Sequence, residues 1–115
     1  MASDCIFCRI VVGDAPASIV YSDDDVTAFR DISPQARVHV LIVPNRHYLS
    51  LIDAAEMEPD LPGRLVHAAV QVARDEGIDQ SGYRLVTNLG PDALQSVDHL
   101  HFHLLGGQEL IARLG

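Results

Sequence analysis

The chain has no lysine and no tryptophan, only two cysteines, and no apolar run long enough to cross a membrane. A transmembrane helix needs about 20 consecutive apolar residues, so we expect no contact with a membrane. The first residues, Met-Ala-Ser-Asp-Cys-Ile, lack the basic start and long apolar segment of a secretory signal. We therefore expect a cytoplasmic protein, in which cysteines are more often reduced or metal-bound than paired in a disulfide.

Positive charge is scarce. The eight basic residues are all arginines and face sixteen acidic residues, which gives a formal net charge of −8 at pH 7. Such an excess of negative charge is repelled by nucleic acids and by anionic membranes, so neither is expected as a partner. A substrate that carries phosphate would have to be held by local groups against this overall field. The composition thus predicts a localised site and no extended basic surface.

The length of 115 residues fits a single domain, residues 1–115, with a core of ordinary size. Alternating or continuous apolar patterns bounded by turn residues indicate strands. Five segments have this character: 18–21, 26–29, 38–43, 83–87 and 98–105. Short turns between several of them favour an α+β fold with a mostly antiparallel, five-stranded sheet. The acidic run 23–25 is interpreted as a hairpin turn.

Helical spacing is clearest between Glu58 and Glu76, where an apolar stripe repeats every three to four residues. Pro62 is compatible only with the first turn of a helix, and Gly77 is a typical residue just after the last turn. A second, short helix is expected from Cys5 to Val11, with Asp4 as a possible cap. The sequence therefore predicts one long and one short helix.

Three histidines alternate with apolar residues in the segment 98–105. If this segment is a strand, His99, His101 and His103 lie on one face, ~7 Å apart from one to the next. The intervening Leu100 and Phe102 then face the core. Half of the six histidines of the chain belong to this row, which packing alone does not explain.

Such a row has two chemical interpretations besides an accidental polar face. His-x-His on a strand can supply two ligands to a metal. Alternatively, a neutral histidine attacks phosphorus while a protonated neighbour neutralises the developing charge. The spacing leaves metal binding and phosphoryl transfer both open.

The second motif is Cys5-x-x-Cys8. It is compatible with two reduced thiols, with a redox pair, or with half of a zinc site. A redox pair of the thioredoxin type should follow a strand, and no strand precedes Cys5. A zinc site needs two further ligands, which His47 and one histidine of the row would supply.

The third motif is the loop from Asn88 to Ser96. The dipeptide Gly90-Pro91 is sufficient to explain it as an ordinary turn. However, it directly precedes the histidine row, where the amide of Gln95 and the hydroxyl of Ser96 are able to donate to an oxyanion. Both interpretations stay open on the sequence alone.

Taken together, these motifs resemble the histidine triad (HIT) family, and most closely its Hint-like branch of purine nucleoside phosphoramidases. Residues 99–105 match the family signature of three histidines separated by apolar residues. The likeness extends over almost the whole chain, from Cys5 to Gly107. Three flanking segments also match: 31–36, 41–47, and 95–97 together with Gly106-Gly107.

The resemblance implies a HIT-like fold and a role for each matching residue. His101 would be the nucleophile that forms a covalent nucleotidyl-histidine intermediate. His103 would contact the α-phosphate, and His39 would support both imidazoles. Asp31 would bind the ribose hydroxyls, with Ile32 beside the base.

The loop residues take substrate-binding roles in the same comparison. Asn88, Gln95 and Ser96 would surround the phosphate, and Ser96 would also assist the leaving amine. Leu94 is a further expected substrate-binding residue of this loop. The resemblance further implies a homodimer whose sheets join, and a structural zinc ion with no metal needed for catalysis. Its ligands would be Cys5, Cys8, His47 and His99.

The expected function is hydrolysis of adenosine or guanosine 5′-phosphoramidates, with the purine nucleoside monophosphate and its conjugates as ligands. Hydrolysis of dinucleoside polyphosphates, or nucleotide sensing with negligible turnover, are the alternatives. The sequence departs from Hint proteins at Ala93 and Leu94, where glycines are usual, and at Asp98, which is commonly aromatic. The chain also ends at Gly115 without a longer tail. These differences bear on which leaving group is preferred, and not on the chemistry at phosphorus.

Overall fold

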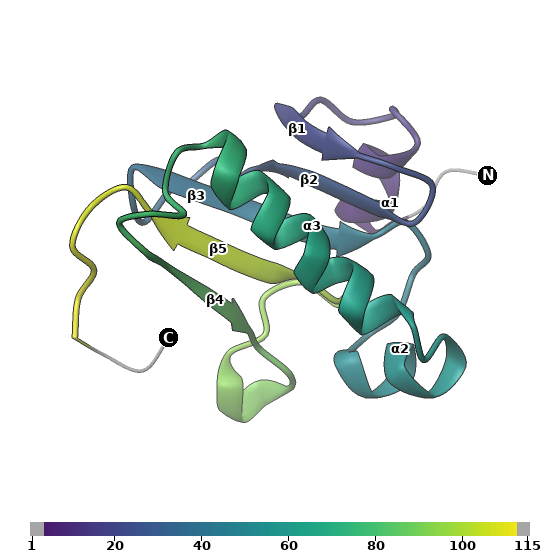
Figure 1. The fold of residues 1–115 in the computed structure, drawn as a ribbon. Helices are drawn as coiled ribbons and strands as arrows, with labels where there is room; N and C mark the ends of the chain where they lie inside the picture. The colour runs from purple at the N-terminus through teal and green to yellow at the C-terminus, as the bar shows by residue number, and fades with distance from the viewer. Residues whose placement is uncertain (1–3, 113–115) are drawn as a thin grey trace.

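The computed structural model describes residues 4–112. The first residues of the N-terminal segment considered above, and the end of the chain at Gly115, lie outside this range. Five strands form one antiparallel sheet in the order β1-β2-β3-β5-β4 (Figure 1). The strands are β1 Ile19–Ser22, β2 Val26–Arg30, β3 Val38–Pro44, β4 Tyr83–Thr87 and β5 Phe102–Gly106. The helices are α1 Ile6–Val11, α2 Leu51–Met57, α3 Leu61–Asp75 and the 3₁₀ turn η1 Pro91–Ala93.

Alternation along the strands divides the core into two layers. Helix α3 crosses one face of the sheet (Figure 1), and its apolar stripe packs against residues such as Ile42 and Leu104. On the opposite face, Phe7 and Ile10 of α1 pack against β2 and β3. Because α1 is short, it covers only part of that second face. The remainder, over β3, β5 and β4, stays open for a site.

The predicted strands are confirmed with boundaries shifted by at most one residue, except at the histidine row. The hairpin between β1 and β2 also forms as expected. Its Asp23 carboxylate accepts hydrogen bonds from the N–H groups of Asp25 and Val26, each 2.8 Å long. An Asp side chain that caps its own turn in this way is a common reason for its presence there.

The prediction of a strand over 98–105 is wrong in its first half, because β5 begins only at Phe102. Before that point the backbone bonds elsewhere: the N–H of Leu100 donates to the oxygen of Tyr48, and the Thr87 hydroxyl donates to the oxygen of His101. The alternation of side chains nevertheless persists. Leu100 is buried in the α3 layer, whereas His99 and His101 contact Phe7 on the other face.

The long helix is confirmed as α3, with Pro62 in its first turn and Gly77 at a φ of +72° after its end. The prediction of only one further helix is wrong, because α2 was missed. This helix has seven residues and a single fully buried one, Ala54, so its sequence carries almost no periodic signal. The cap of α1 is also different from the prediction: the Cys5 sulfur, and not Asp4, accepts the N–H of Cys8.

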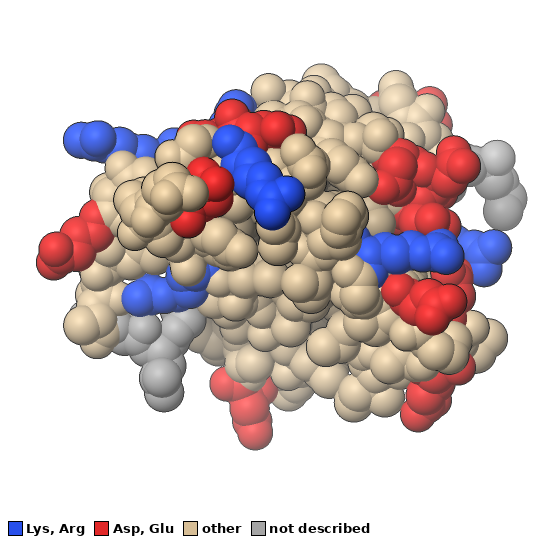
Figure 2. Space-filling model, viewed as in Figure 1, with Lys and Arg blue, Asp and Glu red and all other residues tan. Residues whose placement is uncertain are grey.

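Charged side chains of both signs lie close to one another on the surface. Arginines and acids are interspersed on the face shown in Figure 2, and they do not gather in one basic patch. Several arginines are neutralised locally, as in the ion pairs Arg30–Glu76, Arg46–Glu58 and Arg64–Asp25. Within residues 4–112, no helix is both long and apolar enough to cross a membrane.

Candidate active site

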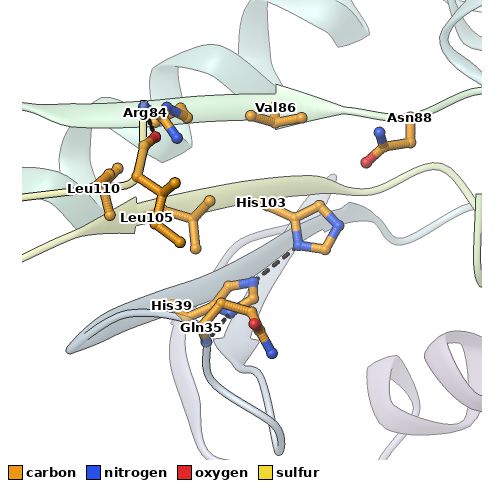
Figure 3. A pocket seen from close by; sticks show the side chains of 9 residues that line it. Gln35, His39, Arg84, Val86, Asn88, His103, Leu105 and Leu110 are labelled. Atoms are coloured by element: carbon orange, nitrogen blue, oxygen red, sulfur yellow. Dashed lines mark hydrogen bonds between the residues drawn. The ribbon is translucent and has the colours of Figure 1, made fainter. Parts of the chain in front are cut away.

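Two adjoining cavities lie on the open face of the sheet, and His103 lines both. The first, here called the α1 cavity, has a volume of about 320 Å³ and extends from α1 to His101. The second, the β4 cavity, has a volume of about 280 Å³ and follows β4 and β5 (Figure 3). His103 thus stands at the junction of the two, with the His101 ring 5.0 Å away from its own, centre to centre.

His101 is held in a defined tautomer by the backbone. Its Nδ1 lies 2.8 Å from the main-chain oxygen of His99, and since a carbonyl only accepts, Nδ1 carries the hydrogen. In the neutral ring, Nε2 therefore keeps its lone pair. The ring is 2% exposed and contacts Phe7 edge-on, with 5.2 Å between ring centres. This arrangement leaves a buried and oriented nitrogen lone pair on His101.

His103 has the opposite tautomer, which is set through His39. The N–H of Gln35 donates to His39 Nδ1 over 3.0 Å, so the hydrogen of His39 lies on Nε2. This Nε2–H donates to His103 Nδ1 at 2.9 Å (Figure 3). His103 in turn must carry its hydrogen on Nε2. Adjacent rings therefore offer a lone pair, on His101, and an N–H donor, on His103.

Burial disfavours the charged forms of His103 and His39. The pKa of His103 is lowered to about 4, mainly by burial and also by the neighbouring imidazoles His101 and His39, against the attraction of Asp31. Burial also lowers the pKa of His39, opposed by the Asp31 carboxylate at 3.4 Å. The lowered pKa favours a neutral His103 near pH 7, whereas the histidine row by itself left a protonated neighbour open. In the neutral form, its Nε2–H is available as a hydrogen-bond donor.

The α1 cavity has mainly apolar walls and one carboxylate. Phe29 and Leu41 form part of the walls, and the side chain of Ile32 is 96% exposed at the rim. The Asp31 carboxylate accepts the N–H of Ser33 at 2.8 Å, which fixes its orientation. A flat apolar ring with hydroxyl groups at one edge would fit this combination of surfaces.

The predicted substrate-binding residues of the loop do not all line the same cavity. Ser96 lines the α1 cavity together with His101, and Asn88 lines the β4 cavity together with His103. Leu94 and Gln95 line neither cavity. Leu94 is 84% exposed and has a φ of +60°.

The amide of Gln95 is occupied within the protein. Its oxygen accepts the N–H of Gly90, and its nitrogen donates to the oxygens of Leu49 and Val97, all at 2.9–3.0 Å. The side chain thus shapes the loop. A direct contact of Gln95 with phosphate would require the loss of these bonds.

Cys5, Cys8, His47 and His99 come together from distant parts of the chain, with their ligand atoms within 4.8 Å of one another. His99 Nδ1 lies 3.3 Å from the Cys5 sulfur and 3.6 Å from the Cys8 sulfur, and His47 Nδ1 lies 3.3 Å from Cys8. Tetrahedral zinc with Zn–S and Zn–N bonds of about 2.3 and 2.05 Å has S···N edges of about 3.5 Å. The donor set and its spacing therefore fit zinc.

The orientation of His99 also fits. Its Nε2 lies 2.9 Å from the oxygen of Pro44 and carries the hydrogen, which leaves Nδ1 as the ligand atom. A second group, Asp31, His39 and His103, is equally compact. There, however, the Gln35 N–H requires that His39 Nε2 carry a hydrogen, so His39 has no lone pair to offer a metal.

Two contributors to the site were not predicted as functional. The first is the backbone N–H of Gln35, which has no signature in the sequence because every residue except proline has such a group. The second is Arg84, which lines the β4 cavity. The alternation within β4 places it on the same face as Val86 and Asn88, so this signal was available in the sequence.

Comparison with known proteins identifies the family of this chain. A family model described as HIT domain matches residues 12–110. The purine nucleoside phosphoramidase of Escherichia coli (strain K12) is 46% identical over 110 residues, which cover 96% of this chain and 92% of that protein. A 14 kDa zinc-binding protein of Brassica juncea is 47% identical over 109 residues, 93% and 96% of the two chains.

The fold agrees as well. A solved histidine triad protein from Clostridium difficile superimposes with a TM-score of 0.93 and 42% identity, and the match covers 99% of both chains. Family model, relatives and fold all extend over nearly the whole chain. The chain belongs to the HIT, or histidine triad, family of hydrolases.

Proposed function

We propose that this protein hydrolyses purine nucleoside 5′-phosphoramidates to the nucleoside monophosphate and a free amine. One observation carries the proposal: at the junction of two cavities, a histidine with a free Nε2 lone pair stands beside a histidine with an Nε2–H. The first is a nucleophile and the second a donor to a phosphoryl oxygen. The name of the Escherichia coli relative supports the substrate class.

In the first step, His101 Nε2 attacks phosphorus and a P–N bond to the histidine forms. The P–N bond to the leaving amine breaks, and the amine nitrogen takes up the proton of the Ser96 hydroxyl, which takes another proton from solvent water. The attacking ring acquires positive charge, which the main-chain oxygen of His99 stabilises through the Nδ1–H bond. His103 Nε2–H meanwhile donates to an oxygen of the phosphoryl group.

In the second step, water attacks the phosphorus of the nucleotidyl-histidine intermediate. The bond between phosphorus and His101 Nε2 breaks, the water loses a proton, and the nucleoside monophosphate is released. His39 keeps the tautomer of His103 fixed in both steps. No metal takes part in this chemistry.

The α1 cavity is proposed to bind the nucleoside, with Asp31 accepting hydrogen bonds from the ribose hydroxyls and Ile32 beside the base. Asn88 and Ser96 approach the phosphate from the loop before the triad, and Leu94 and Gln95 act through the shape of that loop. The net charge of −8 makes such local contacts necessary, because the overall field repels an anionic nucleotide.

We also propose a structural zinc ion held by Cys5, Cys8, His47 and His99. The S···N spacings and the name of the Brassica juncea relative support it. Zinc would connect the N-terminal residues to the row of histidines. A homodimer with joined sheets is a further proposal, based on the family resemblance.

The decisive test is turnover of adenosine 5′-phosphoramidate by wild type, His101→Ala and His101→Gly. Both variants should lose at least about 10³-fold in kcat, as expected when a nucleophile is removed. Mass spectrometry of rapidly quenched wild type should detect an adenylylated His101. The matched control is His67→Ala, since His67 is exposed on α3. Wild-type turnover in either His101 variant would contradict the mechanism.

Diadenosine polyphosphate, assayed under matched conditions, separates the proposed activity from the alternative hydrolase. Faster turnover of the polyphosphate would make hydrolysis of dinucleoside polyphosphates the main activity. Tight nucleotide binding without any adenylylated protein or product would instead indicate a sensor.

A further inference from the structure

A third cavity, here called the N-terminal cavity, lies beside the proposed zinc site. It has a volume of about 630 Å³. Three of the four proposed zinc ligands line it, namely Cys5, Cys8 and His47. Two carboxylates, those of Asp4 and Asp98, line the same cavity. Metal donors and negative charge thus share one space.

The two carboxylates of the N-terminal cavity are not neutralised by arginine. Elsewhere on the surface, Asp25, Glu58 and Glu76 each pair with an arginine side chain. Among residues 4–112, no arginine forms an ion pair with Asp4 or Asp98, and both of these residues are exposed. Their charges therefore remain available to a cation in the cavity.

The burial of the four ligands shows from which side an ion reaches them. His99 is fully buried, with Phe7 against its ring and the oxygen of Pro44 at its Nε2. Cys8 is half-buried, and His47 is exposed. An ion therefore approaches the cluster from the side of Cys8 and His47, and both of these residues line the N-terminal cavity.

We propose that the N-terminal cavity is the route by which zinc enters and leaves, and that Asp4 and Asp98 accelerate its passage in both directions. This inference rests on the proposed zinc site. A cleft lined by charge of one sign raises the local concentration of the opposite ion and its association rate by about 10- to 10³-fold. Asp98 stands where Hint proteins commonly have an aromatic residue, so the second charge is a feature of this chain.

The charge balance of the cluster determines how the carboxylates act. When zinc binds, one Zn²⁺ replaces the thiol protons of Cys5 and Cys8, which pass to solvent water, and the two imidazoles bind as neutral ligands. The net charge of the cluster is therefore the same before and after binding. Asp4 and Asp98 then change the equilibrium affinity little, but they attract the uncompensated dication in transit. A lower free energy of the ion in transit speeds uptake and release by the same factor.

The test measures two quantities on the zinc-loaded protein. The Kd comes from competition with a chelator, and the release rate comes from transfer to an excess of chelator, at concentrations where the rate no longer depends on the chelator. The double variant Asp4→Asn/Asp98→Asn should release zinc about tenfold more slowly than wild type at low salt, with Kd unchanged within about twofold. At about 1 M salt, where the Debye length is about 3 Å, the two rates should converge.

A structural role for the carboxylates would have the opposite sign. If they stabilised bound zinc or the segment that carries Cys5, their loss would raise Kd and speed release. The matched control is Asp14→Asn/Glu56→Gln, which removes the same net charge at two exposed positions that do not line the cavity. Asp98→Phe should slow release at both salt concentrations, because a bulky ring narrows the route.

Equal release rates in wild type and the double variant at low salt, or faster release with weaker binding in the variant, would overturn this inference alone. A wild-type protein that binds no zinc would overturn the proposed zinc site and this inference with it. The proposed hydrolysis is measured separately, by turnover of the phosphoramidate, and does not depend on either result.

Discussion

The main-chain oxygen of His99 accepts the Nδ1–H of His101 at 2.8 Å, while the side chain of the same His99 belongs to the Cys5–Cys8 cluster. One residue thus joins the proposed metal site to the proposed nucleophile. The ring of His99 is fully buried, and its Nε2 is fixed to the oxygen of Pro44. Any movement of the cluster should therefore reach the ring of His101.

Replacement of Cys8, a proposed zinc ligand, should show whether this cluster holds zinc. Purified wild type should contain one zinc per chain by elemental analysis, and Cys8→Ser should contain much less. Ligand binding to the folded state stabilises it by about 2.7 kcal/mol at a hundred times Kd, so the variant should unfold at lower urea concentration.

The matched control is Ser81→Ala, because Ser81 is exposed in a loop far along the sequence from the cluster. Wild-type protein without zinc, whose Cys5 and Cys8 are readily alkylated in the native state, would contradict the proposed site.

Substitution of Asp31 should alter the recognition of ribose. If its carboxylate accepts the ribose hydroxyls, wild type should prefer adenosine over 2′-deoxyadenosine phosphoramidate by about tenfold in kcat/KM, the effect of a hydrogen bond to a charged group. Asp31→Asn should reduce this preference, and the loss should fall mainly on KM. An unchanged ratio in the variant would place the ribose elsewhere.

Loss of the His103 donor should affect the chemical step. His103→Ala removes the Nε2–H that we assign to the phosphoryl oxygen, and one such donor contributes about 10²–10³-fold in kcat. His103→Asn, which keeps an N–H donor of similar reach, should recover part of the rate. Steady-state kinetics of both variants provide the measurement. A fall in kcat/KM through KM alone would show that His103 only binds substrate.

The low pKa of His103 should make stability depend on pH. Because burial lowers this pKa from 6.5 to about 4, the unfolded chain binds a proton between these values that the folded chain does not. The free energy of unfolding should therefore fall as pH is lowered from about 6.5 to 4, with a share from His103 of up to about 3 kcal/mol. Above pH 6.5 this share does not change.

Urea unfolding at pH 7 and pH 5 measures the slope. His103→Asn should have a smaller loss of stability between the two pH values than wild type, whatever its stability at pH 7. Equal losses in the two proteins would show that His103 is protonated in the folded state at pH 5.

Sequence patterns within single segments were sufficient to predict a strand, the long helix and the family of this protein. Alternation predicted β4 at its observed bounds and placed Leu100 in the core, and helical spacing predicted α3 between Pro62 and Gly77. Three alternating histidines with their flanking segments were sufficient to identify the family. These features depend on residues close together in sequence, whose side-chain directions follow from the local backbone.

Only the tertiary structure decided the tautomers of His99 and His103. The tautomer of His103 depends on His39, 64 residues away in sequence, and that of His99 depends on the oxygen of Pro44, 55 residues away. The same holds for Gln95, whose amide nitrogen donates to the main-chain oxygen of Leu49, so that this donor is already occupied within the protein. Backbone donors and acceptors are identical in nearly every residue, so the sequence does not reveal which of them will face a given ring. Their partners are fixed only when the strands and loops pack together.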